Sequence, residues 1–155
     1  MKTKRKKLVI CLAIPLAVGG LAALLSGGMR TYHTLNQPPL SPPGWVFPVV
    51  WSILYLLMGY ASYRILISDA DPDAIRKALT FYFIQLALNF LWPLVFFGLQ
   101  QYFAAFLLLL VLWVFIYLTM YSFGKIDDTA QNLLIPYLLW VTFAGYLNLG
   151  VALLN

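Results

Sequence analysis

The residues of this sequence that are best suited to chemistry are aromatic and amide side chains recurring at helical spacing. They form three stripes: Trp51, Tyr55 and Met58; Gln85, Asn89 and Trp92; and Pro136, Trp140, Ala144 and Asn148. Residues three and four apart lie on one face of a helix, so each stripe predicts a flat, partly polar face. Aromatic walls with a few amide groups suit a large, planar and mostly apolar ligand.

A second interpretation of the same stripes involves no ligand. Asn and Gln side chains often hydrogen-bond between helices in a membrane bundle, where each bond contributes about 1 kcal/mol or less. Aromatic residues near the ends of the apolar stretches, such as Tyr60 and Tyr102, are typical of the belt at a membrane surface. Composition alone does not separate a ligand pocket from contacts between helices, and both interpretations stay open.

Other chemistries lack the residues that they need. The chain has one histidine, His33, and one cysteine, Cys11, and no acidic residue falls within an apolar stretch. A metal site, a proton-coupled pump and a channel with charged rings each require such groups, so we expect none of them. No Ser/His/Asp set, phosphate-binding loop or dinucleotide fingerprint is present. We interpret Cys11 as a packing residue and His33 as a surface histidine.

The composition places the chain in a membrane. Of the 155 residues, 63% are hydrophobic and only 10% are charged, whereas about a quarter of the residues of a soluble domain are charged. This balance excludes a soluble enzyme and a disordered chain. It also excludes a nucleic-acid partner, because the basic residues stand at the chain end and in connections rather than along a groove. The length allows one membrane domain, residues 1–155.

Five apolar stretches are long enough to cross a bilayer as helices. A hydrocarbon core about 30 Å thick needs about 20 apolar residues, and only helices pair every backbone group within their own segment. The predicted spans lie near residues 8–25, 46–67, 78–98, 104–123 and 133–154. The fold class is therefore an all-α integral membrane protein, a bundle of five transmembrane helices. The first stretch also resembles a secretory signal, but its apolar run is longer than a usual signal core, so we expect a retained span.

Basic residues are divided unequally between the two ends of such a bundle. With five spans, all ten Lys and Arg residues except Arg30 fall on the side of the amino terminus. Cytoplasmic loops are enriched in basic residues. The sequence therefore predicts a multi-pass protein of the plasma membrane, with a cytoplasmic N-terminus and an external C-terminus.

The connection between the first two spans is long, polar and rich in proline. It runs over residues 29–44 and contains Pro38, Pro39, Pro42 and Pro43, which stiffen the backbone. A stiff loop on the outer face is able to cover a binding site as a lid, and a solvated linker is the alternative.

Short motifs along the whole chain resemble those of one family. Residues 31–38 read TYHTLNQP, close to the pattern W-Y-x-x-L-x-K-P, and residues 41–47 read SPPGWVF. VWSILYLLMG at 50–59, LNFLW at 88–92 and PYLLW at 136–140 follow in the expected order. On these motifs the chain is identified as a member, of bacterial type, of the TspO/MBR family, which includes tryptophan-rich sensory proteins, translocator proteins and peripheral-type benzodiazepine receptors.

The resemblance implies a five-helix bundle that forms a homodimer among membrane lipids. It also implies a pocket beneath the first connection that binds protoporphyrin IX, haem-like or other tetrapyrroles, or benzodiazepine-type small molecules, in a receptor or carrier that transports or senses them. Carried over residue by residue, the pocket would use Tyr32, Pro42, Pro43, Trp51, Tyr55, Asn89, Phe90, Trp92, Trp140, Phe143, Ala144 and Asn148. We expect no metal ion and no cofactor other than the tetrapyrrole as ligand.

Two other functions stay open. Trp51 and Trp140 match family tryptophans linked to porphyrin breakdown, so a light- and oxygen-dependent porphyrin-degrading enzyme is the first alternative. The second is a structural membrane subunit without a ligand. The sequence also departs from the family pattern at Gln37, where lysine is common, and after Tyr146, where the sterol motif of animal members needs a basic residue. We therefore expect no sterol site.

Overall fold

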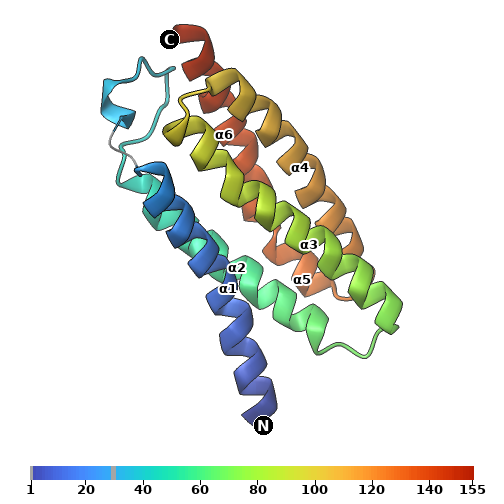
Figure 1. Cartoon of the computed structure of the whole chain (residues 1–155). Helices are drawn as coiled ribbons and strands as arrows, with labels where there is room; N and C mark the ends of the chain where they lie inside the picture. The colour runs from blue at the N-terminus through green and yellow to red at the C-terminus, as the bar shows by residue number, and fades with distance from the viewer. Residues whose placement is uncertain (1, 29–30) are drawn as a thin grey trace.

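Five long helices run side by side through most of the chain. The computed structural model describes residues 2–28 and 31–155, so Arg30, the basic residue expected alone on its side, lies outside the described residues. The long helices are α1 (Lys2–Ser26), α2 (Val46–Leu66), α3 (Pro72–Pro93), α4 (Tyr102–Gly124) and α6 (Ile135–Leu154) (Figure 1). Five helical segments are long and apolar enough to cross a membrane: Lys2–Ser26, Val46–Leu66, Pro72–Gly98, Tyr102–Gly124 and Asp128–Leu154. The described residues contain no β-strand, and the predicted all-α fold class is confirmed.

Three short helices complete the chain: η1 (Tyr32–Thr34), η2 (Leu94–Gly98) and α5 (Asp128–Leu133). The segment η2 is a π-helix that continues α3. Pro93 has no N–H to donate within the helix, and the wider π-turn that follows accommodates the missing bond. Pro136 stands in the first turn of α6, where a missing N–H has no helical partner to lose. The predicted last span, residues 133–154, corresponds to α6, and α5 precedes it as a separate short helix.

The helices extend beyond the apolar stretches that predicted them. α1 begins at Lys2 rather than near residue 8, and α3 begins at Pro72 rather than near residue 78. Charged residues such as Lys and Arg form helices well in water but fall outside an apolar pattern. Hydropathy therefore marks the part of a helix that lies in hydrocarbon and not the end of the helix.

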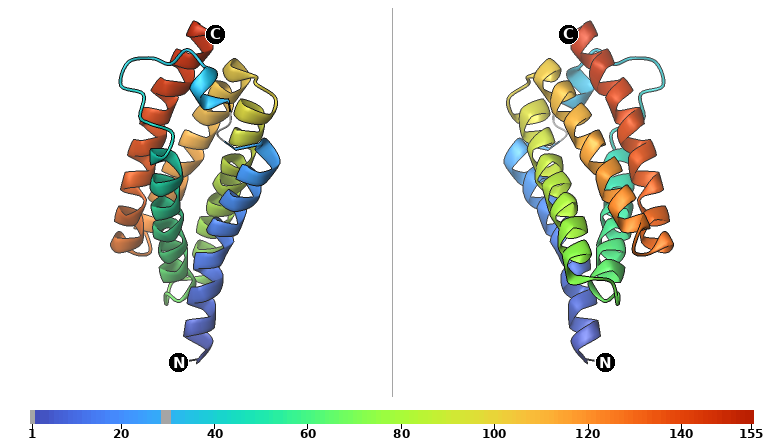
Figure 2. Two further views of the ribbon diagram at one scale, coloured as in Figure 1. Left: turned by 90° about the vertical axis from the view of Figure 1, so that its left-hand side faces the viewer. Right: turned by 90° about the vertical axis from the view of Figure 1, so that its right-hand side faces the viewer.

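The bundle has two distinct ends. The N-terminus and the α2–α3 connection lie at one end, and the C-terminus and the loop of residues 31–45 lie at the other (Figures 1 and 2). Between them α1 packs on α2, α3 packs on α4, and α4 packs on α6. Figure 2 shows that α1 and α2 diverge toward the loop end. This divergence leaves the space in which the candidate site lies.

Near the other end α1 and α2 approach each other closely at Gly59. A Cβ atom added at Gly59 would stand 2.5 Å from the backbone oxygen of Cys11 and 3.0 Å from the Cα atom of Leu12. Small residues permit such approaches between membrane helices. Gly59 therefore fixes the contact from which the two helices diverge.

We expect Gly59→Ala to destabilise the protein by about 1–3 kcal/mol, because the added methyl group meets backbone that cannot rotate away. Gly145→Ala is the matched control, since a Cβ atom there would contact only Leu109, at 3.8 Å. Alanine also favours a helix by about 1 kcal/mol over glycine. Thermal unfolding in detergent micelles should show a lower Tm for Gly59→Ala alone. Equal Tm values for the two variants would contradict the close approach.

An ion pair joins α2 to α5 at the N-terminal end of the bundle. Arg64 Nε donates to Asp127 Oδ2 at 2.7 Å, and Asp127 Oδ1 accepts from the backbone N–H of Thr129 at 2.9 Å. Asp127 therefore both pairs with Arg64 and caps α5. The hydrogen bond from Arg64 is the main reason that the pKa of Asp127 lies below its ordinary value.

This ion pair predicts a loss of stability in acid. Because the pKa of Asp127 is lower in the folded chain than in the unfolded chain, its contribution is complete above the unfolded value of about 4. The contribution disappears as the pH falls through the folded pKa. Measured in micelles, Tm should fall between about pH 5 and about pH 3, and Asp127→Asn should flatten part of that slope. An unchanged slope in the variant would assign the acid sensitivity to other carboxylates.

Candidate ligand-binding site

A cavity of about 400 Å³ lies between the helices at the loop end of the bundle. Its walls come from the second half of α1, the first half of α2, the end of α3 with η2, and the second half of α6. None of its lining residues in the described part of the chain is charged. The volume is in the range that encloses a drug-sized molecule.

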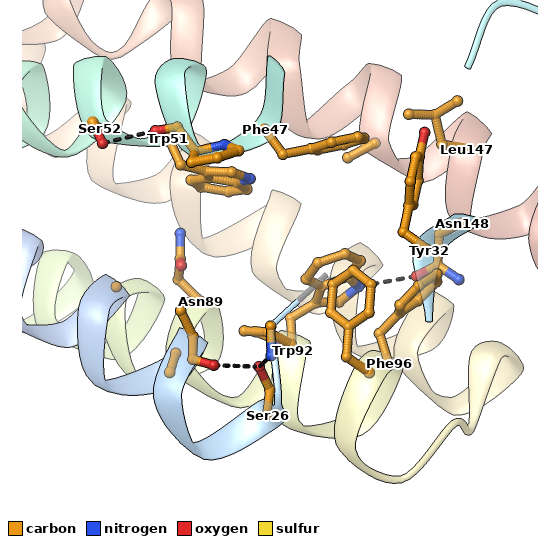
Figure 3. Close-up of a pocket in the computed structure, with 18 of the residues that line it drawn as sticks. Ser26, Tyr32, Phe47, Trp51, Ser52, Asn89, Trp92, Phe96, Leu147 and Asn148 are labelled. Carbon is orange, nitrogen blue, oxygen red and sulfur yellow. Dashed lines mark hydrogen bonds between the residues drawn. The ribbon is translucent and has the colours of Figure 1, made fainter. Parts of the chain in front are cut away.

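Two aromatic pairs form opposite walls of the cavity. On α2 the Trp51 ring stacks on Tyr55 with the ring centroids 5.5 Å apart. Across the cavity the Trp92 ring stacks on Phe96 with the centroids 5.0 Å apart. Figure 3 shows Phe47 and Trp51 facing Trp92 and Phe96 across the hollow. Walls of this kind favour a flat apolar group that stacks on both sides.

Asn148 holds one of these walls in place. Its Oδ1 accepts from Trp92 Nε1 at 2.9 Å, and its Nδ2 donates to the backbone oxygen of Tyr102 at 2.9 Å. The side chain is fully buried and links α6 to both α3 and α4. Asn148 therefore orients the Trp92 ring toward the cavity.

Asn89 connects three helices beside the cavity. Tyr55 OH, on α2, donates to Asn89 Oδ1 at 2.9 Å. Asn89 Nδ2 donates to Tyr137 OH, on α6, at 2.7 Å, and Tyr137 OH donates in turn to Gln85 Oε1 at 2.6 Å. All four side chains are buried, and Gln85 lies outside the lining of the cavity whereas Asn89 belongs to it. The amides thus serve as contacts between helices, and two of them also line the hollow.

The loop of residues 31–45 covers the cavity. Tyr32 OH donates to the backbone oxygen of Pro42 at 2.7 Å, and Gln37 Nε2 donates to the backbone oxygen of Tyr32 at 2.7 Å. The Tyr32 ring meets the Phe47 ring edge-on with the centroids 5.1 Å apart. These contacts hold the Tyr32 ring against the lining of the cavity.

The outer side of the loop is fastened to the end of α6. The Asn36 N–H donates to Asn155 Oδ1 at 3.1 Å, and Asn155 Nδ2 donates to the Asn36 oxygen at 2.9 Å. Tyr146 OH donates to the backbone oxygen of Pro39 at 2.6 Å. Together these bonds fix the loop in its covering position.

The cavity is open between α1 and α2. At Gly19 the missing side chain leaves room for the Tyr55 ring, and beyond that point the two helices diverge (Figure 2). The lining residues there include exposed positions on both helices: Gly20 and Ala23 on α1, and Ser52 on α2. These exposed positions belong to helices long and apolar enough to cross a membrane, so the cavity opens on the side of the bundle that would face lipid.

Seven of the twelve residues predicted to bind a ligand line this cavity. They are Tyr32, Trp51, Tyr55, Asn89, Trp92, Ala144 and Asn148. The structure places the other five outside its lining: Pro42, Pro43, Phe90, Trp140 and Phe143.

For three of these five residues, the local structure explains why they lie outside the cavity lining. Pro42 and Pro43 lie in the covering loop, where Pro42 supports Tyr32 through its carbonyl group. Phe90 follows Asn89, and one residue turns a helix by about 100°. Because Asn89 faces the cavity, the half-buried Phe90 side chain points to a different side of α3.

Trp140 and Phe143 line a separate, open groove between α2 and α6, next to Ile53. Phe47 stands between the two hollows, since it lines the cavity and its ring meets the Trp140 ring edge-on at 5.7 Å. The predicted convergence of Trp51 and Trp140 on one hollow is therefore not observed. Trp51 lines the cavity and Trp140 lines the groove.

The wall provided by α1 was not predicted. It consists mainly of small residues: Gly19, Gly20, Ala22, Ala23 and Ser26. A run of small residues in a membrane helix marks a close approach by another group, and this was the signal available in the sequence. Phe47 and Phe96, which extend the two aromatic walls, were also missed because neither belongs to one of the polar stripes.

Comparison with known proteins finds one family along most of the chain. The model of the TspO/MBR family matches residues 11–154. The tryptophan-rich protein TspO of Chlorobaculum tepidum is 38% identical over 150 residues, which cover 96% of this chain and 95% of that protein. The tryptophan-rich sensory protein of Cereibacter sphaeroides is 42% identical over 80% of this chain and 76% of its own length. The translocator protein of Bos taurus is 39% identical over 78% of this chain and 72% of its own length.

Proposed function

Because the chain belongs to the TspO/MBR family, we propose that it is a membrane receptor or carrier for planar tetrapyrroles such as protoporphyrin IX. The observation that carries this proposal is an uncharged cavity with stacked aromatic pairs on opposite walls. A porphyrin ring is flat and apolar, so burial contributes about 25 cal/mol per Å² and each ring pair adds about 0.5–1.5 kcal/mol. Benzodiazepine-type molecules share these properties and are a second ligand class.

Affinity in this proposal comes mainly from apolar contact. The side-chain oxygen and one N–H of both Asn89 and Asn148 form hydrogen bonds within the protein. These two residues therefore shape the walls more than they bind the ligand. Gln37 and Ser41 line the cavity beneath the loop. A porphyrin would therefore lie with its carboxylates toward the loop, where they stay closest to water.

The opening between α1 and α2 supports uptake of the ligand from lipid, and the fastened loop separates the cavity from the aqueous side. Relatives are named sensory and translocator proteins, which supports sensing or transport of the bound molecule. The protein would work as a homodimer in the plasma membrane. Its N-terminal end would be cytoplasmic, because that end carries nearly all the basic residues.

Titration of protoporphyrin IX into the detergent-purified protein tests binding. We expect tryptophan fluorescence to be quenched with saturation, and Trp51→Phe to remove a larger share of the quenching than Trp113→Phe. Trp113 is the matched control because it lies on α4, outside the cavity lining, where its Nε1 donates to Thr142 at 2.9 Å. Equal loss in the two variants, or the same porphyrin uptake by empty micelles, would refute the site.

Light-dependent breakdown of the porphyrin is a second candidate function. It is favoured by the position of Trp51 in the cavity wall, where the indole would lie beside an excited ligand. Illumination in air with chromatography of the products discriminates the two functions. Bleaching that exceeds the rate in empty micelles and depends on Trp51 indicates an enzyme.

The third possibility is a structural subunit that binds no ligand. In that case porphyrin should leave the Tm unchanged, whereas a protein that binds porphyrin gains stability by mass action.

A further inference from the structure

The first six residues of α1 form an arm that projects beyond the other helices. Figures 1 and 2 show the N-terminal end of α1 extending past the rest of the bundle. This segment, Lys2–Lys7, is called the basic arm here because five of its residues are basic: Lys2, Lys4, Arg5, Lys6 and Lys7. All of them are exposed, and α1 contains no acidic residue.

Two other basic residues at this end of the bundle have acidic partners. Arg64 pairs with Asp127 at 2.7 Å, and Arg76 pairs with Asp73 at 3.3 Å. Within the described ranges 2–28 and 31–155, no residue of the basic arm takes part in an ion pair. The positive charge of the arm is therefore available to a partner outside the chain.

The position of the basic arm on the helix favours such a partner. The N-terminus of a helix carries a partial positive charge, so basic side chains are unfavourable there and favourable at the other end. Five of them in succession repel one another as well as the helix dipole. A surrounding negative charge removes both penalties, and the arm is helical from Lys2 onward.

The arrangement of charge around the helix indicates what kind of partner fits. At about 100° per residue, Lys2, Arg5 and Lys6 fall on one half of the circumference, and Lys4 and Lys7 fall on the other. A folded protein contacts a helix from one side and would leave half of these charges unpaired. A layer of lipid headgroups surrounds the helix and is able to pair all of them.

The depth of the basic arm also matches that layer. The apolar part of α1 begins at Leu8, and six helical residues before it span about 9 Å. Each headgroup region is about 5–7 Å thick outside the hydrocarbon core. Charged side chains on the arm therefore stand at the level of the phosphate groups.

From these observations we propose that the basic arm binds the headgroups of anionic phospholipids, which form a shell around α1 at the N-terminal end of the protein. Clusters of Lys and Arg next to a membrane span are attracted to anionic lipids by charge. This lipid shell would be bound at the opposite end of the protein from the cavity and independently of it. Its loss should therefore leave porphyrin binding unchanged.

Competition between two lipids tests this proposal. The full chain in detergent is incubated with equal amounts of phosphatidylglycerol and phosphatidylcholine of the same acyl chains, and the retained lipids are counted by native mass spectrometry. We expect a preference of about fivefold or more for phosphatidylglycerol at low salt. The preference should fall when NaCl reaches about 0.5 M, where the screening length is about 4 Å.

The decisive variant replaces all five basic residues of the arm by glutamine. Its preference for phosphatidylglycerol should drop close to one. The matched control, Arg76→Gln with Lys77→Gln and Lys125→Gln, removes charge from the same end of the bundle and should keep most of the preference. An unchanged preference in the arm variant, or an equal drop in the control, would overturn the proposal.

Amide hydrogen exchange gives a second measurement. In nanodiscs of phosphatidylglycerol the backbone of the basic arm should exchange more slowly than in nanodiscs of phosphatidylcholine, because the anionic shell stabilises the first turns of α1. Equal exchange in both lipids would overturn the proposal. So would a change of oligomeric state in the arm variant with lipid retention unaltered, since that result would assign the arm to a second copy of the chain.

Discussion

Replacing Ala144 by phenylalanine is expected to raise the Kd for protoporphyrin IX about 100-fold or more, which corresponds to about 2.7 kcal/mol. Ala144 lines the cavity from α6, next in space to Leu147 and Asn148, which line it as well. A phenyl group at this position occupies part of a hollow of about 400 Å³. The ligand then loses room between the aromatic walls, whereas the helix contacts outside the cavity keep their geometry. Fluorescence quenching by the porphyrin measures the change.

Leu153→Phe is the matched control for this variant. Leu153 lies on the same helix and is 68% exposed, so a phenyl group there points to lipid and should leave the Kd within about twofold of the unmodified protein. A thermal unfolding curve for each variant separates lost binding from lost folding. If Ala144→Phe folds normally and binds porphyrin as the unmodified chain does, the cavity is not the binding site.

The five spans were predictable because a segment that crosses hydrocarbon must be apolar and must pair its own backbone groups as a helix. Each span needs a continuous apolar run, and the printed sequence has five of them. The helix ends were not predictable in the same way. α1 continues to Lys2 and α3 begins at Pro72, in segments where water and headgroups satisfy charged side chains. The π-helix η2 depends on how the chain relaxes after Pro93, which an apolar pattern does not report.

The candidate site was predictable where the residues of a stripe point to the same side of their helix. Asn89 and Trp92 stand on the face of Gln85, because seven residues turn a helix by almost two full turns, within about 20°. Even so, Gln85 lies outside the cavity lining. Where the hollow ends along the bundle depends on the point at which α1 and α2 diverge, and no single helix encodes that point.

The stripe on α6 predicted that Trp140 and Asn148 face one cavity, and helix geometry explains why they do not. A repeat of four residues turns by about 40° at each step, so Trp140 and Asn148 differ in direction by about 80°. Asn148 consequently faces the cavity, while Trp140 faces the groove behind Phe47. The small residues of α1 were overlooked because an apolar wall without polar groups looks like ordinary packing in a single sequence.

The second large effect is expected from the bond network that joins α2, α3 and α6. Asn89→Leu removes the acceptor for Tyr55 OH and the donor to Tyr137 OH. Tyr137→Phe removes the second of these bonds and the one to Gln85. Each variant leaves buried polar groups without partners, so we expect each to lower the free energy of unfolding by about 2 kcal/mol. Single bonds between membrane helices average only about 0.6 kcal/mol, but each variant breaks two.

The double variant shows whether these residues act as one network. If they do, Asn89→Leu with Tyr137→Phe should cost about 1 kcal/mol less than the sum of the two single changes, because the shared bond is lost only once. Unfolding in mixed micelles measures all three values. Thr142→Val is the matched control: it removes the acceptor for Trp113 at an exposed site and should change stability by no more than about 0.5 kcal/mol. Additive single effects would mean that Asn89 and Tyr137 stabilise the bundle independently, and that the cavity wall beside them is not held by a connected network.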